Sequence, residues 1–152
     1  MIRVLMQQAP IDIAGELAAI EVVGTGAVAS FTGLVRGDDG IETLELEHYP
    51  GMTEAALRAL AEEAATRWQL LGVSVAHRVG PMRVGERIVF VGTAAPHRAA
   101  ALEACAFLID RLKTDAPFWK REVRGVDARW VDARDADGVA AGRWASPRSA
   151  PA

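Results

Sequence analysis

Two segments with helical periodicity constrain the fold most strongly, because each must bury an apolar stripe against another part of the chain. In residues 53–71, apolar residues recur at helical spacing before Gly72: Leu57, Leu60, Ala61, Ala64 and Trp68. In residues 97–114, a second stripe consists of Leu102, Cys105, Ile109 and Leu112. We therefore predict two long helices, the first capped by Thr53 and the second prevented from continuing by Pro117.

The segments around these helices carry the alternation or the β-branched content that is typical of strands. The predicted strands are residues 2–6, 26–35, 43–49, 73–79, 86–93, 118–123 and 129–133. A shorter helix is predicted over residues 11–21 with Asp12 as its N-cap, and turn residues predict loops at 36–40 and 80–85. Because helices and strands do not alternate regularly, the order favours an α+β fold with mixed or antiparallel sheets over a doubly wound α/β fold.

Length and composition indicate one globular domain. The chain has 152 residues, of which 51% are hydrophobic and 24% charged, so it can build one core but is too short for two full domains. We predict that this domain spans residues 1–144. Residues 145–152 have no apolar periodicity and are predicted to form a disordered tail.

Charge and cysteine content exclude several classes of protein. The net charge of -3 argues against a surface built to hold nucleic acid, because such a surface must neutralise many phosphates. The single cysteine, Cys105, has no internal disulfide partner, and no run of about 18 apolar residues is present to span a membrane. We therefore predict a soluble cytoplasmic protein that binds neither nucleic acid nor membrane.

The basic residues are fifteen Arg and only two Lys, which are Lys113 and Lys120. A general bias toward Arg codons explains the high ratio of Arg to Lys, but it does not explain why these two positions are Lys. Lysine can lose its proton in a desolvated site and act as a nucleophile or as an acid or base, whereas arginine stays charged. The two lysines are therefore candidates for positions that require an amine, with ordinary surface or helix-capping lysines as the alternative.

Cationic residues mark further places where an anion could bind. His97 and Arg98 stand at the predicted start of the second long helix, where the helix dipole disfavours cations unless an anion is bound. Arg36 closes a predicted strand beside a Gly-rich loop, from which a guanidinium can reach a phosphate. Lys120 follows the aromatic pair at 118–119, which could form one wall of a site for a ring-shaped ligand. The alternative in each case is a solvated surface residue.

The remaining reactive residues fit structural roles. His48 and His77 lie on alternating apolar segments and Cys105 on a helical stripe, so we interpret them as core or half-buried residues. Three scattered histidines and one cysteine provide no metal-ligand spacing, and we expect neither a metal nor a cofactor. Gly-rich nucleotide-binding loops and a GxSxG motif are absent from the sequence.

Five blocks of sequence together resemble the catalytic subunit of molybdopterin synthase, the MoaE family. In chain order they are FTGLVR (31–36), LEHYPGM (46–52), HR (97–98), LKTDAPFWKRE (112–122) and RWVDAR (129–134). The resemblance covers roughly residues 25–144, which is most of the chain. The string APFWKRE after a helix-ending LKT is too long and unusual to expect by chance.

The resemblance implies an α+β hammerhead-type domain and a sulfur-transfer reaction. Family enzymes convert cyclic pyranopterin monophosphate to molybdopterin by installing two dithiolene sulfurs, a step of molybdenum cofactor biosynthesis. Each sulfur arrives as a thiocarboxylate on the C-terminal glycine of a small ubiquitin-like carrier subunit. Two large subunits form a central homodimer with one small subunit at each end, so a heterotetramer is expected.

The resemblance also implies a site. Lys113 and Lys120 match the family's two essential lysines, and we expect Lys113 to be the principal catalytic residue. The implied substrate-binding residues are Leu34, Val35, Arg36, His97, Arg98, Lys113, Lys120, Arg121 and Glu122, with Arg134 as a weaker candidate for holding the partner's tail or an anion. His97 and Arg98 are expected to reach the pocket of the neighbouring subunit. Leu34 stands where some family members have Lys, so it could contribute only backbone.

The alternative function is a noncatalytic module that binds a phosphorylated metabolite or an acidic peptide tail. Such a module would keep the arginines and histidines but would not need the lysines. A structural dimerisation protein is a third possibility, which leaves the clustered cations unexplained.

Overall fold

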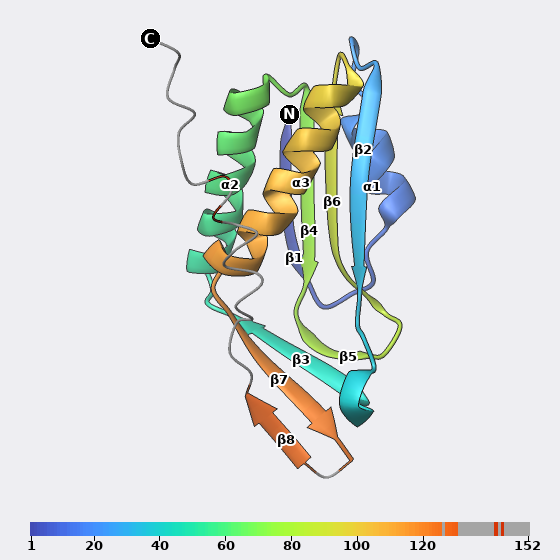
Figure 1. Cartoon of the computed structure of the whole chain (residues 1–152), viewed down its shortest axis with the longest axis vertical. Helices are drawn as coiled ribbons and strands as arrows, with labels where there is room; N and C mark the ends of the chain where they lie inside the picture. Colours follow the sequence, from blue (N-terminus) through green and yellow to red (C-terminus); the bar gives the residue numbers. More distant parts are fainter. Residues whose placement is uncertain (126, 131–141, 143, 145–152) are drawn as a thin grey trace.

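The computed structural model describes residues 1–125, 127–130, 142 and 144, and Figure 1 shows their arrangement. The elements in chain order are β1 (Ile2–Gln7), α1 (Ile13–Ile20), β2 (Ala27–Leu34), the short 3-10 helix η1 (Asp38–Gly40), β3 (Thr43–His48), α2 (Met52–Trp68), β4 (Gly72–Arg78), β5 (Gly80–Arg83), β6 (Arg87–Ala95), α3 (Arg98–Asp115), β7 (Phe118–Arg124) and β8 (Asp127–Trp130). The strands of the described residues form two four-stranded sheets beside the helices, and the predicted α+β class is confirmed.

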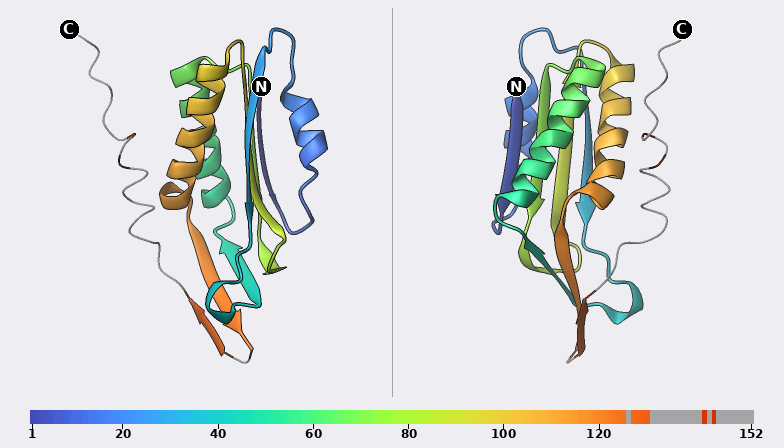
Figure 2. Two further views of the ribbon diagram at one scale, coloured as in Figure 1. Left: turned by 45° about the vertical axis from the view of Figure 1, so that its right-hand side comes forward. Right: turned by 90° about the vertical axis from the view of Figure 1, so that its left-hand side faces the viewer.

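The main sheet has the strand order β1-β4-β6-β2. β1 and β4 run parallel, and the other neighbouring strands are antiparallel. Helices α2 and α3 pack on one face and α1 on the other, as the two views in Figure 2 show. Every residue of β4 is buried because both faces of this central strand are covered. The largest core cluster lies between the sheet and the two long helices and includes Leu57, Ala61, Val75, Val91 and Phe107.

The second sheet lies at the C-terminal end of α3 and has the order β5-β3-β7-β8, with all pairs antiparallel (Figure 1). It has a small core of its own, formed by Val35, Leu44, Leu46 and Met82. Only residues 116–117 separate the end of α3 from the start of β7. The position of the second sheet therefore depends directly on where α3 ends.

Residues 80–85, predicted to form a turn, include a strand. Gly80 has a φ of 83°, which lets the chain turn sharply at the end of β4. Residues 80–83 then pair with β3, with Gly80 opposite Leu46. Pro81 is tolerated because β5 is an edge strand, with no neighbour on one side among the described strands. The prediction was wrong for 80–83, and the turn is confined to residues 84–86.

Both long helices lie close to their predicted ranges, but two details differ. α2 begins after Gly51, so Thr53 is not its N-cap. The Thr53 hydroxyl instead accepts the N–H of Tyr49 (3.0 Å) and donates to the Pro117 carbonyl (2.7 Å), which ties α2 to the start of β7. Leu102 is 61% exposed, so it does not belong to the buried stripe of α3. That stripe consists of Ala101, Ala104, Cys105, Phe107, Leu108 and Leu112.

Helix α1 is fixed to the main sheet by polar contacts. The Asp12 carboxylate accepts the N–H of Gly15 (3.1 Å), which confirms the predicted N-cap. Glu16 is buried and accepts two hydrogen bonds from the Arg3 guanidinium, at 3.0 and 2.8 Å, and one from the Ser74 hydroxyl at 2.7 Å. These bonds join α1 to β1 and β4. The hydrogen bond from Arg3 is the main reason that the pKa of Glu16 is lowered.

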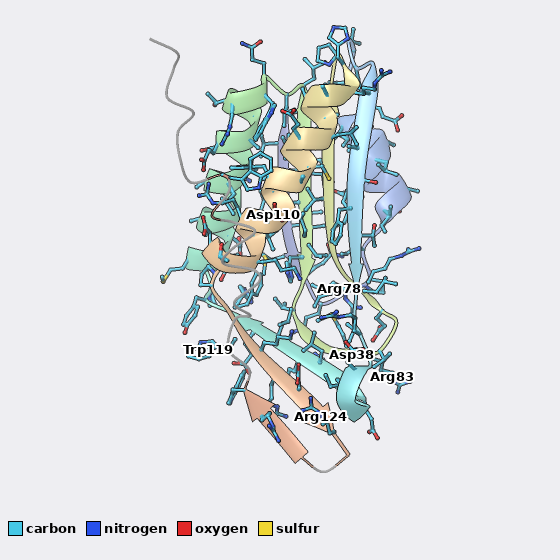
Figure 3. All side chains as sticks on the ribbon, in the orientation of Figure 1. Asp38, Arg78, Arg83, Asp110, Trp119 and Arg124 are labelled. Carbon is cyan, nitrogen blue, oxygen red and sulfur yellow. The ribbon has the colours of Figure 1, made fainter. Side chains whose placement is uncertain are left out.

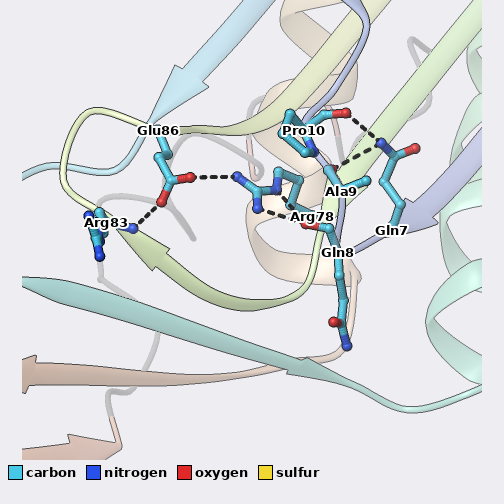
Figure 4. A network of polar contacts seen from close by, with 7 residues as sticks. All are labelled: Gln7, Gln8, Ala9, Pro10, Arg78, Arg83 and Glu86. Atoms are coloured by element: carbon cyan, nitrogen blue, oxygen red, sulfur yellow. Dashed lines mark hydrogen bonds and ion pairs between the residues drawn. The ribbon is translucent and has the colours of Figure 1, made fainter.

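A second polar network holds the region where β4, β5 and β6 meet (Figure 4). Arg78, at the end of β4, is buried and donates from Nε and Nη2 to the Gln8 carbonyl at 3.0 and 2.7 Å. Its Nη1 lies 3.3 Å from Oε1 of Glu86. Glu86 also accepts the backbone N–H of Arg83, which lowers the pKa of its carboxyl together with Arg78. The network therefore fixes the turn between β5 and β6 against the chain that leaves β1.

In the described part of the chain, none of the helices combines the length and apolar character needed to cross a membrane. The strand predicted at 129–133 is observed as β8 as far as Trp130. Residues 131–133 and the predicted tail at 145–152 lie outside the described residues.

Candidate functional site

The two lysines lie on consecutive elements. Lys113 is in the last turn of α3 and is exposed, so burial within a single chain does not desolvate it. Lys120 is half-buried on β7, directly opposite Leu46 of β3. Figure 1 shows α3 passing directly into β7 where the helical layer meets the second sheet. Because only residues 116–117 join these elements, both lysines lie at this junction.

Strand alternation divides the candidate residues of β7 between two faces. Phe118, Lys120 and Glu122 share one face with Leu44 and Leu46, since directly opposed residues of antiparallel strands point to the same side. Leu44 and Leu46 are buried, so this is the inner face of the second sheet.

Trp119 and Arg121 occupy the outer face. Trp119 is 52% exposed and packs near Tyr49 and Trp130, with ring centroids 6.0 Å from each, and Figure 3 shows it beside β7. The idea that Phe118 and Trp119 together wall a ring-shaped ligand is therefore wrong. Neighbouring residues of a strand point to opposite sides.

Charge pairing differs between these two faces. Nη2 of Arg121 lies 3.3 Å from Oε2 of Glu45, the residue opposite it on β3. Its Nε is buried and has no hydrogen-bond partner within the described ranges. On the inner face, Oε2 of Glu122 accepts a hydrogen bond from Nη2 of Arg124 at 3.0 Å. Lys120 and Arg121 are adjacent in sequence, but they cannot serve the same face of the sheet in one chain.

His77 completes the junction from the main sheet. It is 6% exposed, its ring stacks on Phe118 with centroids 4.2 Å apart and planes at 26°, and its Nδ1 lies 2.9 Å from the Arg78 carbonyl. Burial lowers the pKa of His77 to about 4; the contact with the Arg78 carbonyl opposes this shift, and the positive charge of Lys113 adds to it. The ring is therefore neutral at pH 7, and the predicted core role of His77 is confirmed.

The three candidates at the end of β2 have different environments. Leu34 is 53% exposed, and Arg36 is exposed with its Nε 3.5 Å from Oδ2 of Asp38. Val35 is 4% exposed and belongs to the small core of the second sheet. Its N–H donates to the Glu86 carbonyl and its own carbonyl accepts from Gly85. Val35 is thus engaged in packing and backbone pairing, while Leu34 and Arg36 face solvent.

His97 and Arg98 lie at the opposite end of α3 from the lysines. His97 is the N-cap residue, and both side chains are exposed. The rise of an α-helix puts Arg98 and Lys113 roughly 22 Å apart along the axis. Within one chain, the cations at the start of α3 are therefore separate from the lysines at the junction. Arg134 lies outside the described residues.

Comparison with known proteins establishes the family. Residues 6–115 match the family model described as MoaE protein. The chain belongs to the MoaE family. A molybdopterin synthase catalytic subunit from Cereibacter sphaeroides is 50% identical over 145 residues, covering 93% of this chain and 99% of that protein.

Solved structures agree with this assignment. A molybdopterin biosynthesis MoaE protein from Burkholderia ambifaria superimposes with a TM-score of 0.83 at 44% identity, covering 96% of this chain and 99% of that one. A protein-protein complex of subunits 1 and 2 of molybdopterin-converting factor from Helicobacter pylori contains a chain with the same fold, with a TM-score of 0.72 at 21% identity, covering 88% of this chain and 91% of that one. The MoaE fold expected from the sequence is therefore confirmed. The expected enzyme class is confirmed as well, because the relatives are molybdopterin synthase catalytic subunits.

Sequence reasoning missed one feature of this MoaE chain, the contact between His77 and the junction. His77 is 36 residues away from Lys113 in the sequence, and its alternating environment indicated only a core position. Nothing local to either segment shows that the end of β4 meets the start of β7. Among the described residues, no group of three or more His, Cys, Asp or Glu is placed to hold a metal ion. Cys105 is buried, and burial raises its pKa to about 11, as suits an inert core thiol.

Proposed function

We propose that this chain transfers sulfur to cyclic pyranopterin monophosphate to form the dithiolene of molybdopterin, with Lys113 and Lys120 at the reacting centre. The sulfur donor is a small ubiquitin-like carrier subunit that ends in a glycine thiocarboxylate. One observation carries the proposal: in a MoaE-family chain with only two lysines, both lie where α3 passes into β7. The reaction takes place in the cytoplasm.

The sulfur-transfer reaction requires cationic groups that can also donate or accept a proton. Sulfur attack on the pterin side chain builds up negative charge, and an ammonium group nearby stabilises it and can donate a proton. An arginine could supply the charge but not the proton, because its pKa is too high. A matched Lys113→Arg variant therefore separates the two contributions.

The position of His97 and Arg98 supports a site completed by a second copy of the chain. These residues cannot reach Lys113 of their own chain across roughly 22 Å of helix. In a homodimer, the start of α3 from one subunit can lie against the junction of the other and supply cations for the substrate phosphate. The small subunit then binds at each outer end, which gives a heterotetramer. The fold shared with the Helicobacter pylori complex is compatible with such a partner.

The test is a reconstituted reaction of this chain with a thiocarboxylated carrier and cyclic pyranopterin monophosphate, assayed for dithiolene product. We expect product from the wild type and its loss in Lys113→Ala and Lys120→Ala. Lys113→Arg should bind substrate but form product slowly. Arg58→Ala, which removes an exposed cation of α2, is the matched control and should remain active. Tight carrier binding without product in the wild type would instead favour the noncatalytic binding module.

A further inference from the structure

We propose that His77 is a positioning residue that, through its stack on Phe118, sets the location of Lys120 relative to Lys113. The proposal rests on the proposed function, since the two lysines must act together for their separation to matter. His77 itself need not touch substrate, and its effect passes through Phe118.

The stack joins the two sheets by a contact distinct from that of Ile88, the β6 residue that packs against the core clusters of both. His77 belongs to β4 of the main sheet and Phe118 to β7 of the second sheet. Their centroids are 4.2 Å apart and their planes differ by 26°, so the rings lie face to face. Phe118 also begins β7, and its partner on β3 is His48. Any displacement of Phe118 therefore moves the first residue of the strand that carries Lys120.

The His77 ring is held by a rigid support. A carbonyl oxygen only accepts hydrogen bonds, so Nδ1 of His77 must donate to the Arg78 carbonyl across their 2.9 Å contact. Arg78 is itself fixed by the Gln8 carbonyl and by Glu86 (Figure 4). Figure 3 shows Arg78 where the main sheet meets the second one. The ring is thus oriented by the main sheet and transmits that orientation to β7.

The position of His77 favours an uncharged ring. The positive charge of Lys113 reaches His77 and opposes its protonation, and burial has the larger effect in the same direction. A permanently positive side chain at this position would repel Lys113 and distort the arrangement of the lysines. An uncharged aromatic side chain can form the stack without that conflict, so Phe is the substitution that should preserve function.

Variants of His77 separate stacking from the other roles of the residue. His77→Phe keeps an aromatic ring but loses the Nδ1 donor, whereas His77→Asn keeps a polar donor but loses the stack. We expect kcat to fall roughly 10- to 100-fold in His77→Asn and His77→Ala, because misplacement of reacting groups by about 1 Å has that effect. The KM for the pterin should stay within about twofold, and His77→Phe should retain most of kcat.

Val73→Ala is the matched control, because it removes side-chain volume from the same strand at its other end, where Val73 is fully buried. It should lower thermal stability without lowering kcat at a temperature where it is folded. Wild-type kcat in folded His77→Ala would overturn the proposal. An equal loss of kcat in His77→Phe and His77→Ala would also overturn it, by making the imidazole itself the essential feature.

Amide hydrogen exchange of residues 118–124 tests the same idea without any turnover. Loss of the stack should speed exchange across β7 in His77→Ala and leave it near the wild-type rate in His77→Phe and Val73→Ala. Unchanged β7 protection in His77→Ala would overturn the proposal even if the wild type makes no product. If only the proposed function is wrong, the wild type should form no product, but exchange in β7 should still be faster in His77→Ala than in the wild type and His77→Phe.

Discussion

Replacement of Arg78 should loosen the junction between the two sheets, and the structure indicates by how much. The side chain is 8% exposed and donates twice to the Gln8 carbonyl, whereas its other partner, Glu86, is 40% exposed and can return to water. Loss of charged hydrogen bonds to one carbonyl costs about 1.5–3 kcal/mol. Loss of the two buried methylene groups that Ala lacks adds about 1.6 kcal/mol. We therefore expect Arg78→Ala to lower the free energy of unfolding by about 3–4.5 kcal/mol.

For a chain of this size, a loss of that order corresponds to a drop of roughly 6–18 °C in Tm. Circular dichroism melts of the purified chain measure it. Arg78→Lys keeps a charge and most of the stem but has no guanidinium fork, so its Tm should lie between those of Arg78→Ala and the wild type. Arg58→Ala, on an exposed face of α2, should shift Tm by less than about 2 °C. Equal Tm values for Arg78→Ala and Arg58→Ala would refute the assigned role of the network.

Two further predictions concern ionisation. The pKa of Glu16 is lowered chiefly by Arg3, so Glu16 stabilises the fold above its unfolded pKa, near 4.3, and this contribution is lost as pH falls through the lower folded value. Urea midpoints of the wild type should therefore fall more steeply below about pH 4 than those of Glu16→Gln, and parallel curves would contradict this linkage. Because burial raises the pKa of Cys105 to about 11, the native thiol should react slowly with a disulfide reagent at pH 8 and quickly in urea. Fast, complete labelling of the native chain would show that Cys105 is accessible.

Local patterns were sufficient to predict most of the elements, because amphipathic periodicity is a property of neighbouring residues. The Asp12 cap, the two long helices and the strand predicted at 73–79 all appear close to where they were expected, the strand as β4 (Gly72–Arg78). The short strand β5 was missed because a four-residue segment with Gly80 and Pro81 has the composition of a turn. Its pairing with β3 is a long-range contact, so the segment itself carries no sign of it.

The candidate site was predictable in its residues but not in its arrangement. The LKTDAPFWKRE block carried both lysines, yet alternation along β7 separates Lys120 from Arg121 and Phe118 from Trp119. The stack of His77 on Phe118 depends on how the main sheet meets the second one, which no segment encodes by itself. The separation of His97 from Lys113 follows from the length of α3 and could have been calculated from the predicted helix alone.

The most direct test of the central claim is product formation by mixed dimers of two inactive variants. Lys113→Ala lacks the junction lysine, and a double variant with His97→Ala and Arg98→Ala lacks the cations at the start of α3. If each site combines the junction of one chain with the helix start of the other, random re-association of equal amounts makes about one quarter of the sites complete. We predict dithiolene product at about a quarter of the wild-type rate from the mixture and almost none from either variant alone. The composite site would be contradicted if the wild type forms product but mixtures shown to contain mixed dimers form no more product than either variant alone.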